Sequence, residues 1–174
     1  MINDMLEQII LVDKEDNPMG FCEKMKAHKE GKLHRAFSIF IFNSEKDLLI
    51  QQRAKLKYHS GGLWSNTCCS HHRFGETLDE AIHRRLKEEM GFDCELKEIF
   101  SFIYKTEFKD INLFEHELDH VYIGNYNGEI VVNFLEVEDY KWISKNALLK
   151  DIDLNSEKYT YWFKITINRV LGLL

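Results

Sequence analysis

The stretch Thr77-Leu-Asp-Glu-Ala-Ile-His-Arg-Arg-Leu-Lys-Glu-Glu-Met-Gly91 contains the clearest element of structure in the chain. Thr77 and Glu80 fit a capping box, and Gly91 fits the left-handed residue that ends many helices. Apolar side chains recur every four residues and form one stripe, at Leu78, Ile82, Leu86 and Met90. The pattern predicts an amphipathic helix from Thr77 to Met90 that covers one face of a core.

Apolar runs on both sides of this helix indicate strands. Residues 33–43 are nearly continuously apolar in their second half, as expected of a strand covered on both faces, and residues 47–53 would pair with them across a short turn. Further strands are expected at 8–13, 94–108 and 114–124, a turn at 16–20, a helix at 157–173 and a short helix after Ser144. The order of elements predicts an α/β (α+β) fold with a central sheet between helices.

Composition restricts the class of protein. The 174 residues contain one proline and no Gly- or Ser-rich run, so a single domain over residues 1–174 is expected. The net charge of -6 argues against a nucleic-acid partner or an anionic membrane surface. The acidic start and the lack of a long apolar stretch predict a cytoplasmic protein with neither leader nor membrane span.

Residues with reactive or metal-binding side chains are concentrated just before the helix. The segment Trp64-Ser-Asn-Thr-Cys-Cys-Ser-His-His72 combines an indole, two thiols and two imidazoles. The cysteines are expected to be reduced thiols, because two of them are adjacent, which disfavours a disulfide between them, and because their spacing fits no zinc ribbon. His28 and His34 lie upstream, while Glu115 and Glu117 alternate along a strand and so face one side of a sheet. Three imidazoles and two carboxylates can complete a site for Mg²⁺, Mn²⁺ or Zn²⁺.

The helix and the residues before it also align with the Nudix box, G-x5-E-x7-R-E-U-x-E-E-x-G-U. Glu76 takes the position of the first glutamate, and Arg84-Arg-Leu-Lys-Glu-Glu-Met-Gly-Phe92 takes the tail. Two residues depart from it, since Ser70 replaces the first glycine and Arg85 replaces a glutamate. That glutamate helps to hold magnesium in Nudix hydrolases, so the reversed charge disfavours metal at this face and favours a phosphate contact.

Several motifs in order resemble the type I isopentenyl diphosphate isomerases over nearly the whole chain. They are Lys24-x-x-x-His28, Leu33-His-Arg-Ala-Phe37, Gly62-Leu-Trp-Ser-Asn-Thr-Cys-Cys-Ser-His71, Gly75-Glu76 with the Arg84-Arg-Leu helix, Tyr104, Glu115-x-Glu117 and Trp162. The resemblance implies a Nudix-like mixed sheet sandwiched between helices. It also implies a monomer or weak dimer that binds a small-molecule diphosphate. His72 occupies a place often held by proline in the family, which is expected to alter the local turn.

Matching positions imply a role for each site residue. The catalytic residues would be Cys69, Glu117, Tyr104 and Trp162, with Glu117 the expected proton donor and Cys69 its partner. The metal ligands would be His28, His34, His71, Glu115 and Glu117, and Glu89 would meet a second, substrate-borne Mg²⁺. The diphosphate contacts would be Lys24, Arg53, Lys57 and Arg85. No flavin is expected, because the chain has no Gly-rich nucleotide loop.

The reaction that the resemblance implies is the interconversion of isopentenyl and dimethylallyl diphosphate through a tertiary carbocation. Two other functions remain open. One is a Nudix pyrophosphohydrolase of nucleotide diphosphates, against which Arg85 argues. The other is a noncatalytic, metal-dependent binding module on the same scaffold, for which Cys69 and Glu117 would be dispensable.

Overall fold

Helix α3 (Leu78–Met90) begins and ends where the sequence predicts in the computed structural model, which describes residues 7–173. The Thr77 side chain accepts a hydrogen bond from the Glu80 backbone N–H, and the Glu80 carboxylate accepts one from the Thr77 N–H, which completes the capping box. Gly91 ends the helix at a φ of 76°, where a residue with a Cβ would be strained.

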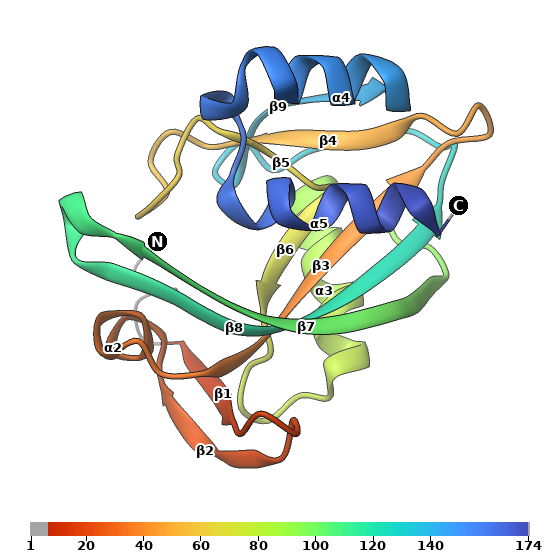
Figure 1. The fold of residues 1–174 in the computed structure, drawn as a ribbon. Coiled ribbons are helices and arrows are strands. Elements are labelled where there is room, and N and C mark those ends of the chain that lie inside the picture. Colours follow the sequence, from red (N-terminus) through yellow and green to blue (C-terminus); the bar gives the residue numbers. More distant parts are fainter. Residues whose placement is uncertain (1–6, 174) are drawn as a thin grey trace.

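Besides α3, the described part of the chain contains nine strands and three further helices, which Figure 1 labels. The strands are β1 (Gln8–Val12), β2 (Pro18–Glu23), β3 (His34–Phe42), β4 (Leu48–Arg53), β5 (Trp64–Ser65), β6 (Cys68–His71), β7 (Leu96–Phe108), β8 (Leu113–Asn125) and β9 (Val137–Ile143). The helices are α2 (Lys24–Glu30), α4 (Lys145–Leu154) and α5 (Tyr161–Gly172), with 3₁₀ turns η1 (Lys109–Ile111) and η2 (Ser156–Lys158).

The strands expected at 8–13, 33–43, 47–53, 94–108 and 114–124 are confirmed to within about two residues, as is the short helix after Ser144. The turn expected at 16–20 is wrong, because Pro18 begins strand β2. The turn lies earlier, where the Asp13 carboxylate accepts hydrogen bonds from the backbone N–H groups of Glu15 and Asn17. Asp13 therefore closes the turn before the proline is reached.

The last helix begins four residues later than the expected range of 157–173. Residues Ser156–Lys158 form the turn η2, and the chain is then extended, with the Thr160 N–H donating to the Trp64 carbonyl oxygen at 2.9 Å. This contact ties the start of α5 to strand β5. Helix α2 and strands β2 and β9 did not emerge from the sequence pattern, since each is short or half-exposed.

The sheet is mixed. Strands β3 and β8 run parallel over nine residue pairs, and the other described strand pairs are antiparallel. Strand β4 meets β3 at only two pairs next to their shared turn and then pairs with β9. The sheet therefore curls away from β3 at that end, so that β3 is bordered by both β6 and β8 (Figure 1).

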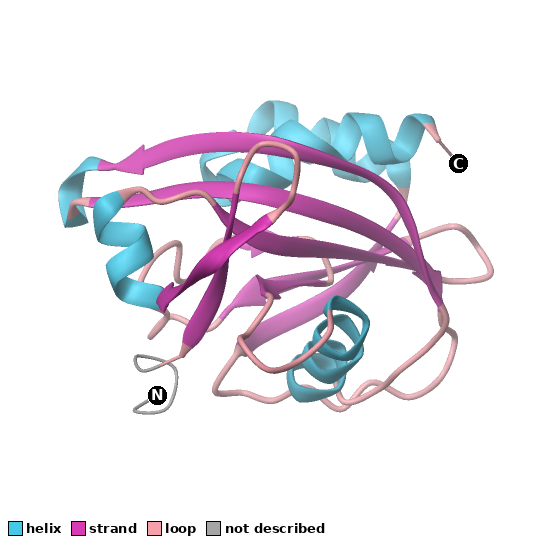
Figure 2. Ribbon diagram, turned by 90° about the horizontal axis from the view of Figure 1, so that it is seen from below, coloured by secondary structure: helices cyan, strands magenta, loops and turns pink. Residues whose placement is uncertain are grey.

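Alternate residues of β3 supply two separate cores. Phe37, Ile39 and Ile41 pack with α3, whereas Phe40 and Phe42 pack with α4 and α5. Figure 2 shows the sheet between α3 on one side and the α4–α5 layer on the other. The expected sandwich of a mixed sheet between helices is confirmed.

Within residues 7–173, none of the helices combines the length and the apolar content needed to cross a bilayer. The acidic start of the chain, from which the absence of a leader was expected, lies almost wholly outside the described residues.

Candidate active site

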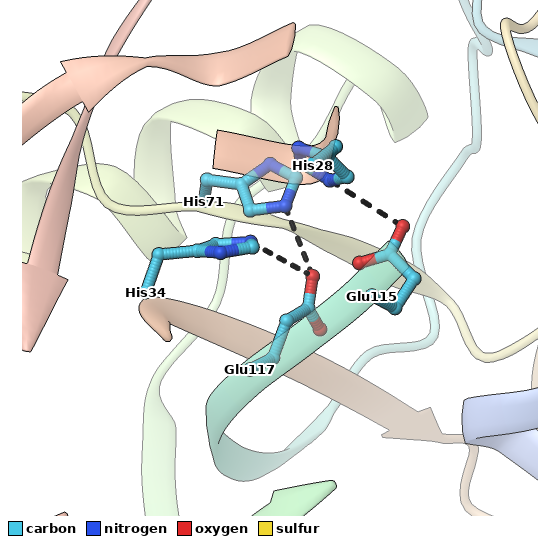
Figure 3. A group of neighbouring side chains, drawn as sticks. All are labelled: His28, His34, His71, Glu115 and Glu117. Carbon is cyan, nitrogen blue, oxygen red and sulfur yellow. Dashed lines mark hydrogen bonds and ion pairs between the residues drawn. The ribbon is translucent and has the colours of Figure 1, made fainter. Parts of the chain in front are cut away.

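Five side chains with nitrogen or oxygen ligand atoms converge at one end of the sheet (Figure 3). Each offers one ligand atom, and these atoms all lie within 4.8 Å of one another. The residues are His28 on α2, His34 on β3, His71 on β6 and Glu115 and Glu117 on β8. The set expected from the sequence is therefore brought together.

Strand register explains why the cluster forms. His34 is the direct parallel partner of Glu117, and Glu117 is the direct antiparallel partner of Tyr104. His71 pairs with Ala36, two residues along β3 from His34, so both imidazoles leave the same face. Helix α2 then delivers His28 from above the sheet, with its ring 4.9 Å from the His34 ring.

The histidines are oriented as metal ligands usually are. Nδ1 of His28 lies 2.7 Å from the Lys24 carbonyl oxygen, and Nδ1 of His34 lies 2.9 Å from the Lys32 carbonyl oxygen. A carbonyl oxygen only accepts, so each Nδ1 carries the hydrogen and each Nε2 presents a lone pair to the cluster.

Buried polar atoms without partners support the same conclusion. Within the described residues, Nε2 of His34, Nδ1 of His71 and Oε2 of Glu115 are buried and have no hydrogen-bond partner. Such atoms are costly to leave unpaired in a folded protein. This mixed set of nitrogen and oxygen donors fits a divalent metal ion and can hold one.

Burial and neighbouring charges shift the pKa values of the cluster residues in different directions. Burial raises the pKa of Glu115, but His28 and His59 outweigh it, and the pKa of Glu115 is held well below its usual value. Burial also disfavours a charged His28, yet Glu115 leaves the pKa of His28 raised. Burial lowers the pKa of His71 well below normal despite its hydrogen bond to Glu117, so His71 is neutral and able to ligate.

The two adjacent cysteines point to opposite faces of β6. Cys68 is fully buried in the core beside α3, whereas Cys69 lies on the α5 side and lines the cleft. Burial raises the pKa of the Cys69 thiol to about 12, although Arg53, whose Nη1 lies 3.9 Å from the sulfur, opposes the shift. Burial therefore favours the protonated form of the Cys69 thiol near neutral pH.

Cys69 and Glu117 line the same cleft. The Tyr104 hydroxyl donates to Oε2 of Glu117 at 2.6 Å, and burial raises the Tyr104 pKa well above normal, so that this donor keeps its proton. Trp162 borders the same space, and its Nε1–H donates to the Ser65 hydroxyl at 3.0 Å, which fixes the plane of the indole. The four expected catalytic side chains thus share one cavity.

The expected diphosphate contacts also line this cleft. They are Lys24, Arg53, Lys57 and Arg85. Burial opposes the charge of Arg85, but Glu89 and other carboxylates leave its pKa raised well above normal. Glu89 is not at the cleft wall, because it lies buried between Arg85 and Gln51, whose Nε2 donates to Glu89 Oε2 at 2.7 Å. His72 lies outside the cluster and contacts Arg35 and the Glu76 carbonyl oxygen.

The sequence did not point to His59, which lines the cleft, or to Glu136, which contacts two of the cleft residues. His59 follows Lys57 in the loop before Gly61-Gly62, and its imidazole contacts Glu115. A histidine so close to the motif at Trp64 was the available signal. Glu136 bridges Lys57 and Arg85, and no pattern pointed to it because it precedes β9, which was itself missed.

Comparison with known proteins agrees with the fold and identifies the family. Residues 32–163 match the NUDIX domain model. The chain is 52% identical to the Aromatoleum aromaticum protein named isopentenyl-diphosphate Delta-isomerase 2, over 97% of this chain and 88% of that one. It is 50% identical to the Burkholderia multivorans isopentenyl-diphosphate Delta-isomerase, over 95% of this chain and 93% of that one.

Solved structures share the fold at low identity. A Deinococcus radiodurans crystal structure superposes with a TM-score of 0.70 at 20% identity, over 86% of this chain and 90% of that one. A MutT NUDIX hydrolase from Burkholderia pseudomallei gives 0.63 at 18% identity, over 79% and 98%. With a NUDIX domain over most of its length and relatives of about half-identical sequence, this chain belongs to the isopentenyl-diphosphate Delta-isomerase family.

Proposed function

We propose that this protein interconverts isopentenyl diphosphate and dimethylallyl diphosphate by proton addition and removal, as a step in isoprenoid precursor synthesis. The observation that carries the proposal is that Cys69, a thiol, and Glu117, one of the five side chains of the candidate metal-binding cluster, line one cleft. The names of the half-identical relatives support the same reaction.

The chemistry needs two proton-transfer groups. Moving the double bond requires one proton to be added at the terminal alkene carbon and another to be removed from C2, through a tertiary carbocation. An alkene is a very weak base, so the acid must be held against it and water must be excluded from the cation. Cys69 and Glu117 are the proposed pair, and they exchange roles in the reverse direction.

The protonation state of Cys69 bears on which of the two groups donates a proton first. Burial raises the pKa of the Cys69 thiol to about 12, which favours the protonated thiol. A protonated thiol can only donate, so Cys69 must first lose its proton if Glu117 is to donate first and Cys69 is to act as the base at C2. Glu117 accepts the hydrogen bond of Tyr104, which fixes one carboxylate oxygen. The expectation that Glu117 is the first donor stays a prediction.

The proposed ligands of a divalent metal are His28, His34, His71, Glu115 and Glu117, with Mg²⁺, Mn²⁺ and Zn²⁺ all compatible with the donor set. Bound there, the ion would supply positive charge that polarises the Glu117 carboxyl group. Glu89 is proposed to meet the Mg²⁺ that accompanies the substrate diphosphate. The pairing of its carboxylate with Arg85, which lines the cleft, supports this role, although Glu89 itself lies behind the cleft wall.

The remaining residues are proposed to bind the diphosphate and to stabilise the carbocation. Lys24, Arg53, Lys57 and Arg85 supply local positive charge for the diphosphate, which a chain of net charge -6 has to concentrate. The Trp162 indole is proposed to stabilise the carbocation by a cation–π contact worth about 0.5–2 kcal/mol. Such a contact assists the reaction but is too small to account for it alone.

One assay tests the function. Purified protein is incubated with isopentenyl diphosphate and Mg²⁺ in deuterated water, and the product is examined by NMR and mass spectrometry. We expect dimethylallyl diphosphate carrying solvent deuterium, because the added proton comes from groups that exchange with solvent. Release of inorganic phosphate or of a nucleoside monophosphate from a nucleotide panel, without isomer formation, would instead favour a pyrophosphohydrolase.

A further inference from the structure

His59 makes a direct contact with one of the proposed metal ligands. Its Nε2 lies 2.6 Å from Oε1 of Glu115, and the residue is only 6% exposed. A carboxylate oxygen accepts hydrogen bonds, so at this distance Nε2 of His59 carries the hydrogen and donates it to Oε1. Nδ1 is then free to accept from the Ser60 hydroxyl at 3.2 Å, which accounts for both ring nitrogens of a neutral imidazole.

Packing on two sides restrains the plane of the His59 ring. The ring stacks on Phe108 with centroids 5.0 Å apart and an interplanar angle of 17°, and it meets Trp162 edge-on at 5.7 Å. Arg53 donates to the His59 carbonyl oxygen at 3.3 Å, which ties down the backbone of the same residue. A donor held on three sides can fix the group to which it donates.

The two oxygens of Glu115 are in different environments. Oε1 receives the His59 hydrogen bond, whereas Oε2 is buried and has no hydrogen-bond partner within residues 7–173. His59 itself is not among the five residues whose ligand atoms lie within 4.8 Å of one another. The Nε2 hydrogen of His59 is therefore hydrogen-bonded to Glu115, and His59 lies outside the group of five proposed ligands.

We propose that His59 is a positioning residue for the metal centre, which holds the Glu115 carboxylate in the orientation that presents an oxygen to the ion. The inference rests on the proposed function in one respect, the assignment of Glu115 as a ligand. Ligating carboxylates are commonly hydrogen-bonded by neighbours, and the loss of such a neighbour typically costs about 10–100-fold in metal affinity or activity.

The test measures metal affinity without turnover. Metal-free protein is titrated with Mn²⁺ by calorimetry for the wild type, His59→Phe, His59→Gln and His83→Phe. Phe keeps the ring packing but cannot donate, Gln restores a donor, and His83 pairs with Asp93 at 2.5 Å away from the cluster. We expect Kd to rise about 10–100-fold for His59→Phe, to recover largely for His59→Gln, and to stay unchanged for His83→Phe.

Two results would overturn the proposal and are distinguishable from each other. If His59→Phe binds Mn²⁺ as tightly as the wild type, the metal site stands and the positioning role falls. If the wild type binds no Mn²⁺ at this cluster, both the metal assignment and the role of His59 fall. Circular dichroism and thermal melting of the metal-free variants check that each one is folded.

Discussion

At the scale of single residues, the period of a strand decides which of two neighbouring thiols is available for chemistry. Cys68 and Cys69 are adjacent in β6, so their side chains leave opposite faces. Cys68 meets the α3 core, and Cys69 meets the cleft that also holds Glu117 and Trp162. The same residue type therefore has a structural role at one position and a proposed proton-transfer role at the next.

This division predicts a contrast between two matched variants. Cys69→Ala should lower kcat for isopentenyl diphosphate at least about 100-fold, because a proton-transfer group contributes roughly 10²–10⁴ in rate, while the melting temperature changes little. Cys68→Ala should keep most activity and lose about 1 kcal/mol of stability, since a fully buried side chain is shortened. Steady-state kinetics and calorimetry measure both. Equal losses of activity in the two variants would remove Cys69 from the mechanism.

At the scale of elements, Glu136 links helix α3 to the loop after β4. Its carboxylate contacts the Lys57 ammonium and accepts from Nη2 of Arg85 at 3.2 Å. The Glu136 carbonyl oxygen also accepts from the Ala54 N–H at 3.0 Å, which ties the segment before β9 to the same loop. Two cations that would otherwise repel each other are thereby held side by side, facing the cleft.

Loss of this carboxylate should weaken substrate binding more than chemistry. Glu136→Gln is expected to raise KM for isopentenyl diphosphate about tenfold with kcat nearly unchanged, because a charge-assisted hydrogen bond contributes about 1.5–3 kcal/mol. Glu138→Gln is the matched control, since within residues 7–173 Glu138 pairs with exposed Lys55 and neither residue lines the cleft. A lower KM in Glu136→Gln would mean that Glu136 competes with the diphosphate.

At the scale of the whole molecule, the metal-binding cluster exists only in the folded chain. Its ligand atoms come from α2, β3, β6 and β8. Of these, the three strands are joined by the parallel β3–β8 pairing and the antiparallel β3–β6 pairing. Apart from His28 and His34, which are six residues apart, ligands from different elements are far apart along the chain and come together only on folding. An ion that binds the cluster therefore binds the native state preferentially and stabilises it.

Metal removal should consequently lower the melting temperature. At a Mn²⁺ concentration 100 times Kd, binding adds about 2.7 kcal/mol, or roughly 5–10 °C at about 2–4 °C per kcal/mol for a chain of this size. His71→Ala should abolish the difference between Mn²⁺ and EDTA. His72→Ala should preserve that difference while lowering both temperatures, since it loses its contacts with Arg35 and Glu76. Scanning calorimetry measures the melting temperatures with Mn²⁺ and with EDTA. If the difference between them in His71→Ala equals that in the wild type, His71 is not a ligand.

Much of the architecture was accessible from local pattern. The α3 caps and its four-residue stripe depend on residues within one segment, so the boundaries of that helix were predictable. The apolar run of β3 likewise indicated a strand covered on both faces. The types and order of the motif residues indicated the family, which the comparisons confirm.

The tertiary structure decided what depends on distance through space. Period-two alternation says that Cys68 and Cys69 differ, but only the placement of α3 and α5 says which one meets the cleft. In the same way His59 joins Glu115 because loop 54–62 contributes to the cleft. His72 does not, because it leaves the opposite face from the adjacent His71 and contacts Arg35. The sequence by itself determined local geometry and residue chemistry. The partners of each side chain depended on register and layer packing, which are set by contacts between residues far apart in the chain.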